Sequence, residues 1–138
     1  PMTDLRAAAY YGSHHVVDSS EIAFKIAASQ AFKLAVQSAS PVLLEPVMKL
    51  TVWAPQEFVG DIISSLNGKR GRIMGMGAAG PQPQIEAEAP LAELLDYALE
   101  LKSLTQGRAT FQMEFLRYQV VASEKLTEEL LKRERRER

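Results

Sequence analysis

The sequence contains no cysteine and only two histidines among its 138 residues. A chain without cysteine forms neither disulfides nor a thiolate-bound zinc site, and a reducing compartment is its expected setting. No apolar run approaches the ~18 residues that a membrane span needs, and the first residues do not follow the order of a signal peptide. Basic and acidic side chains nearly balance, 16 against 17, so net charge gives no argument for nucleic acid. These absences predict a cytoplasmic protein with neither membrane nor DNA as its partner.

Residues 1–40 predict a strand over 4–11, then a loop, then an alanine-rich helix that ends near Ser38. The helix is expected to begin at a capping box, because Asp18 and Glu21 have the required spacing. Only one narrow polar stripe interrupts its apolar surface, so most of its circumference needs cover. One strand cannot supply that cover. We therefore expect an incomplete strand–loop–helix piece of another α+β domain, whose remaining strands lie upstream.

The segment 41–46 is bounded by two prolines and predicts a short, stiff linker. Residues 47–122 then show four strand-like alternating patterns and two patterns with helical spacing, in the order βαββαβ. That order is typical of a ferredoxin-like, two-layer sandwich with both helices on one face of the sheet. Residues 123–138 form a charged C-terminal tail with a narrow leucine stripe, which predicts a terminal helix. The predicted fold class is therefore α+β, with the incomplete piece preceding the ferredoxin-like domain.

No catalytic constellation and no metal site are expected from the residues. His14 and His15 are adjacent and therefore point to opposite sides of an extended chain, with no cysteine or third histidine to complete a zinc site. The strand around Glu86 carries no aromatic residues on its polar side, which argues against base stacking as in RNA-recognition motifs. One basic cluster is a candidate for contact with phosphates, and its members are Lys69, Arg70 and Arg72. The tail is either a solvated helix or a second RNA contact, through Lys132, Arg133, Arg135, Arg136 and Arg138.

Several motifs resemble bacterial elongation factor G. Residues 11–27 resemble its GSYHDVDSSExAFKxA segment. Further motifs of its last domain recur in the same order along residues 41–115, and they are PVLLEP, GDI, KRG, PL, TQGRA and MEF. The resemblance covers roughly residues 3 to 118.

The resemblance implies that residues 1–40 are the end of domain IV and residues 47–122 are domain V of a ribosomal translocase. Such a protein couples GTP hydrolysis in an N-terminal domain to movement of the tRNA–mRNA complex. Its partners would be the ribosome's decoding-region RNA and, on the large subunit, the stalk-base protein with nearby rRNA. The family's tip loop, which reaches the codon–anticodon region, maps onto Gly12, Ser13, His14 and His15. GTP and magnesium are expected only in the missing domain, since this sequence has no GxxxxGK[ST] motif and is not itself expected to be an enzyme.

Three alternatives remain open at the level of the sequence. His14 replaces the tyrosine of the family's tip, and Val16 replaces an acidic residue, which suggests a divergent paralogue that acts in ribosome recycling. A free-standing ferredoxin-like domain that binds a ligand or regulates a partner is another possibility. Ribosome-protection proteins and other translational GTPases share the LLEP linker and domain V, but they lack the stretch from GSYH to DSSE.

Overall fold

A computed structural model describes residues 1–13 and 20–137, and it divides the chain into two compact units. Unit 1 is Pro1–Pro41 and unit 2 is Val42–Arg138. In the described part of the chain, no helix is both long and apolar enough to cross a membrane.

Unit 1 contains a single described helix, α1 (Glu21–Ser38). Its N-cap is Ser20, whose Oγ accepts a hydrogen bond from the backbone N–H of Ala23 at 3.1 Å. Asp18, the expected capping residue, lies outside the described residues. None of the residues of α1 is buried, and its large apolar side chains are exposed: Ile22, Phe24, Ile26, Phe32 and Leu34.

The prediction of a strand over residues 4–11 was wrong. These residues lie in the described part of the chain, and they form no strand there. A strand is defined by hydrogen bonds to a neighbour, and the described residues of unit 1 offer no second extended segment that pairs with this one. Residues 4–11 therefore stay unpaired despite their apolar composition.

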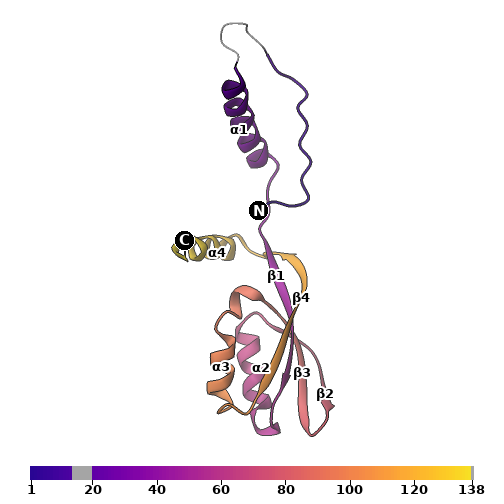
Figure 1. The fold of residues 1–138 in the computed structure, drawn as a ribbon. Coiled ribbons are helices and arrows are strands. Elements are labelled where there is room, and N and C mark those ends of the chain that lie inside the picture. The colour runs from indigo at the N-terminus through magenta and orange to yellow at the C-terminus, as the bar shows by residue number, and fades with distance from the viewer. Residues whose placement is uncertain (14–19, 138) are drawn as a thin grey trace. The chain divides into compact units, whose positions relative to one another are not determined.

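Unit 2 is the predicted ferredoxin-like sandwich (Figure 1). Its four described strands pair antiparallel in the order β2-β3-β1-β4. Both long crossovers carry a helix over the same face of the sheet, where α2 and α3 lie side by side. The elements are β1 (Leu44–Trp53), η1 (Gln56–Phe58), α2 (Val59–Gly68), β2 (Arg72–Ala79), β3 (Gln82–Pro90), η2 (Leu91–Glu93), α3 (Tyr97–Leu104), β4 (Thr110–Val120) and α4 (Glu124–Glu137).

The core lies between the helices and the sheet. Alternate residues of the two central strands face it, so that Leu50 of β1 pairs with Ala87 of β3 and Met113 of β4. From α2, Ile62 and Leu66 enter the same layer at helical spacing. The fully buried large side chains are Tyr97, Leu50, Ile62, Leu66, Ile85, Leu101, Val52 and Thr105.

Two element boundaries differ from the sequence prediction. The segment expected as a linker, 41–46, is only partly a linker, because β1 begins at Leu44. There, Leu44 pairs with Val120 at the end of a β4 that is longer than its alternating pattern indicates. The second pattern with helical spacing begins after Pro90 in the sequence, but residues 91–93 form a 3₁₀ turn and α3 starts only at Tyr97.

Candidate functional site

The expected tip loop is described only in its first half. Gly12 and Ser13 are exposed residues of unit 1. His14 and His15, the two histidines of the predicted RNA contact, lie outside the described residues, and so does Val16. The histidine contact therefore stays a prediction.

The predicted phosphate cluster is not one patch: Lys69 and Arg70 form ion pairs with different carboxylates, and Arg72 lies on the sheet. Lys69 follows α2, and its Nζ lies 2.7 Å from Glu100 of α3, which Ser65 of α2 also contacts by donating its hydroxyl hydrogen. The pKa of Glu100 is lowered: burial raises it, but the hydrogen bonds from Lys69 and Ser65 favour the charged form more. Lys69 thus ties the two helices together.

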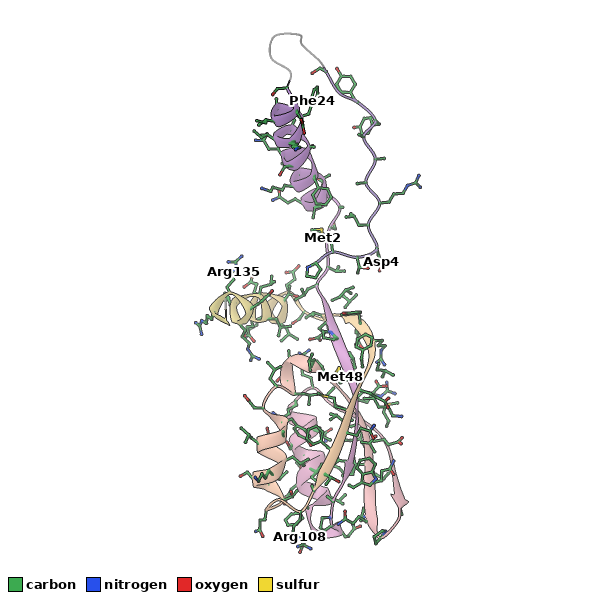
Figure 2. All side chains as sticks on the ribbon, viewed as in Figure 1. Met2, Asp4, Phe24, Met48, Arg108 and Arg135 are labelled. Carbon is green, nitrogen blue, oxygen red and sulfur yellow. The ribbon has the colours of Figure 1, made fainter. Side chains whose placement is uncertain are left out.

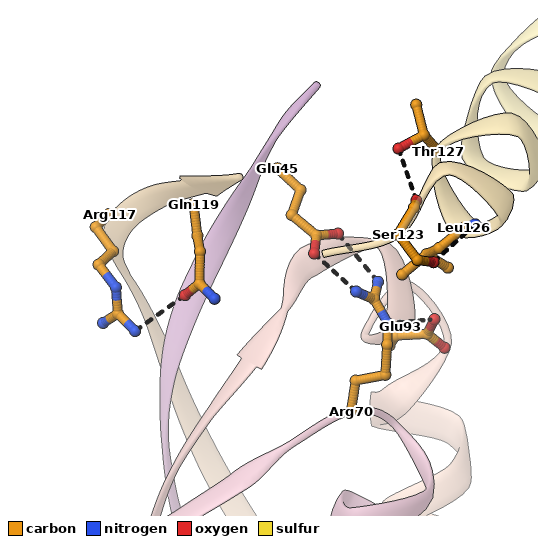
Figure 3. Close-up of polar contacts among 8 residues, drawn as sticks. All are labelled: Glu45, Arg70, Glu93, Arg117, Gln119, Ser123, Leu126 and Thr127. Carbon is orange, nitrogen blue, oxygen red and sulfur yellow. Dashed lines mark hydrogen bonds and ion pairs between the residues drawn. The ribbon is translucent and has the colours of Figure 1, made fainter. Parts of the chain in front are cut away.

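Arg70 holds two carboxylates at once (Figure 3). Its two terminal nitrogens donate to Glu45 at 2.7 and 3.0 Å, and its Nε donates to Glu93 at 3.3 Å. The hydrogen bond to Glu45 is the main reason that the pKa of Arg70 is raised. Its donors therefore already have partners within unit 2.

Arg72 belongs to the opposite face of the sheet, the one that α2 and α3 leave open. The register places Arg72 beside Glu88, Glu88 beside Lys49, and Lys49 beside Glu114, in a row across all four strands. We call these four residues the charge row. Its charges alternate in sign, so each is balanced by a neighbour.

A third cation, Arg117, pairs with a carboxylate of the charge row. Arg117 of β4 donates to Glu88 at 2.9 Å, and this hydrogen bond is the largest cause of the lowered pKa of that carboxyl. Trp53 lies further along the same open face, paired with Gln84 and Thr110. The open face therefore presents balanced charge and one aromatic ring, which is a poor match to base stacking by neighbouring aromatic side chains.

The sequence analysis did not identify the partners of these cations. Glu45 was assigned to the linker, and Glu93 was given no role. Only the turn that connects α2 to β2 brings Arg70 to both of them.

At the end of unit 2 opposite α4, Arg108 pairs with Glu57 and stacks over the ring of Phe58 at 5.6 Å (Figure 2).

An open groove of about 770 Å³ lies between α4 and the start of β1. Leucines and charged residues line it, among them Leu91 of η2 and Leu130 of α4. Among the described residues, no group of three or more histidines or carboxylates could hold a metal ion. The ion pairs of Lys69, Arg70 and Arg117 are structural ones, because both partners of each belong to unit 2.

Two adjacent parts of the chain match family models. Residues 1–40 match the model of elongation factor G, domain IV, and residues 42–129 match that of the elongation factor G C-terminus. A crystal structure of a protein from Thermus thermophilus is similar over 90% of this chain, at 48% sequence identity and a TM-score of 0.70. The chain spans only 19% of that protein's length.

The fold and these matches define a piece of a translation factor. The chain belongs to the elongation factor G family. The resemblance predicted from the motifs is thereby confirmed. The matched regions correspond to domain IV and the C-terminus of elongation factor G.

Proposed function

We propose that the chain is the ribosome-contacting part of an elongation-factor-G-like GTPase that works in the cytoplasm. The observation that carries the proposal is the order of the two family matches, which meet where the two compact units meet. In this proposal, GTP hydrolysis in another domain is coupled to movement of tRNA and mRNA through both units. The chain itself has no GxxxxGK[ST] motif, and no nucleotide or magnesium chemistry is assigned to its residues.

Unit 1 would contact RNA of the decoding region through its tip. Gly12 and Ser13 support this because they are exposed, and backbone groups at such positions can approach RNA closely. The side chains of His14 and His15 would add hydrogen bonds to sugar or phosphate without a fixed charge. Unit 2 would contact the stalk-base protein and rRNA of the large subunit.

The domain IV match distinguishes among the alternatives. Residues 1–40 match a domain of elongation factor G, which favours this family over ribosome-protection proteins that share only the linker and last domain. The matches over both units also disfavour a free-standing ligand-binding domain. A paralogue that acts in recycling remains the second candidate, since His14 and Val16 differ from the family's tip sequence.

Co-sedimentation of the 138-residue chain with 70S ribosomes across a salt series tests the proposal. We expect saturable binding that weakens steeply with salt, because phosphate contacts release counterions. Lys69→Ala and Arg72→Ala are the variants for the phosphate cluster, and Lys102→Ala on α3 is the control that removes one charge elsewhere. Arg70 is left intact, since it holds Glu45 and its loss would disturb the structure.

The outcomes separate the proposal from its details. Saturable, salt-sensitive binding that the control retains and the cluster variants lose would support two statements. One is that this chain docks on the ribosome, and the other is that Lys69 and Arg72 belong to the interface. Binding unchanged in the cluster variants would remove Lys69 and Arg72 from the interface. Absence of saturable binding at low salt would contradict ribosome docking by this chain.

A further inference from the structure

The start of β1 holds a buried carboxylate. Glu45 is 8% exposed, and a buried carboxylate is costly unless it is paired. Both of its oxygens accept from the guanidinium of Arg70, at 2.7 and 3.0 Å. Such a two-pronged pair fixes direction as well as distance, so it defines where Glu45 lies.

The backbone that presents Arg70 is itself rigid. Arg70 has a φ of 55°, in the left-handed region, directly after α2. The N–H of Gly71 bonds to the carbonyl of Leu66 at 2.9 Å, which closes the helix as in a Schellman motif. A Cβ at Gly71 would lie 2.5 Å from that carbonyl oxygen. Glycine is therefore required beside Arg70, and the guanidinium projects from a fixed turn.

The first residues of β1 have a strand neighbour on one side only. Leu44, Glu45 and Pro46 pair with β4. The pairing of β1 with β3 begins only at Val47, opposite Pro90. On the side where β3 has ended, η2 contacts β1, and Arg70, which Glu93 of η2 anchors, holds Glu45 by side-chain hydrogen bonds.

We propose that Arg70 is a positioning residue that takes the place of the missing strand neighbour and fixes residues 44–46. The helix α1 ends at Ser38 and unit 2 begins at Val42, so a short segment, 39–41, connects this helix to unit 2. The functional consequence rests on the proposed function: a force on unit 1 would reach the sheet of unit 2 through a short connection with a fixed end. Hydrogen exchange tests the positioning role of Arg70 without the ribosome. Its result is therefore independent of whether the chain docks on the ribosome.

Amide hydrogen exchange is measured on the 138-residue chain and its variants. In Arg70→Ala we expect exchange at Glu45 and Val47 to accelerate roughly ten- to a hundredfold, from loss of a charged, two-pronged hydrogen bond. Exchange at Leu50 in the middle of β1 should keep the wild-type rate. The matched control is Lys69→Ala, which breaks an ion pair at the same helix end but one directed to α3.

Arg70→Lys is the second variant, because it keeps the positive charge but not the planar guanidinium that donates two parallel hydrogen bonds. We expect the same local acceleration, smaller in size, in a folded protein. Wild-type exchange at Glu45 and Val47 in this variant would overturn the inference. Equal acceleration across the whole sheet would also overturn it, since Arg70 would then support overall stability rather than position the start of β1. The same local acceleration in the Lys69→Ala control would overturn it as well.

Discussion

Replacing Tyr97 by phenylalanine should leave unit 2 at least as stable as the wild type. Tyr97 is 1% exposed, and its ring packs edge-on against Phe111 with centroids 5.7 Å apart. Its hydroxyl is buried and has no hydrogen-bond partner among the described residues. An unsatisfied buried hydroxyl costs about 1–3 kcal/mol. Phenylalanine keeps the ring packing and removes that cost, so the free energy of unfolding should stay equal or rise by up to this amount.

The same hydroxyl predicts how stability depends on alkaline pH. Burial raises the pKa of Tyr97 from 10.0 to about 12. A raised pKa in the folded state contributes stability that is present below the unfolded value and lost as pH rises through the folded value. At about 1.4 kcal/mol per unit, roughly 2–3 kcal/mol of unfolding free energy should disappear between about pH 10 and pH 12. The phenylalanine variant should lack this loss.

Urea unfolding, followed by fluorescence of the single tryptophan, Trp53, measures both effects. Tyr118→Phe is the control, because Tyr118 is 63% exposed. A Tyr97→Phe variant that loses more than about 1 kcal/mol at neutral pH would show that the hydroxyl makes a stabilising bond. Parallel alkaline curves for the wild type and this variant would refute the assignment of the pH dependence to Tyr97.

Three further substitutions test local packing and hydrogen bonding by chemical denaturation. Gly71→Ala should destabilise unit 2 by about 1–3 kcal/mol, because the new Cβ would meet the carbonyl of Leu66. Gly60→Ala, which has open space in the first turn of α2, should stabilise it by about 0.5–1 kcal/mol, and effects of one sign at both positions would contradict the packing argument. Thr105→Val should cost about 1–3 kcal/mol, because the buried hydroxyl donates to Leu101 and accepts from the N–H of Ala109. A neutral Thr105→Val would show that neither bond contributes to stability.

The fold of unit 2 was predictable because its elements carry strong local signals. The alternation in β1 around Leu50 and the helical spacing of Ile62 and Leu66 both describe a single buried face. The boundaries were less predictable, since they depend on the partner strand. Leu44 belongs to β1 because Val120 of β4 is there to pair with it.

Which residues become buried in the core also depends on tertiary context. Leu95 follows the helical pattern after Pro90 but is exposed, because a 3₁₀ turn precedes α3 and changes the phase of the helix. Tyr97 takes the buried position instead. The spacing of apolar residues assumes one continuous helix, and a single irregular turn moves each later residue to another face.

The charges of unit 2 could not be interpreted from the sequence at all. Arg72, Glu88, Lys49 and Glu114 lie far apart in the chain, and only the strand register brings them into the charge row. Nearness in sequence suggested instead that Lys69, Arg70 and Arg72 form one basic patch. Because Lys69 and Arg70 each hold a carboxylate, an RNA phosphate would have to displace a protein partner at these two sites, which reduces the gain from each contact. Contact of unit 2 with RNA should therefore depend more on shape and on exposed loops than on this cluster.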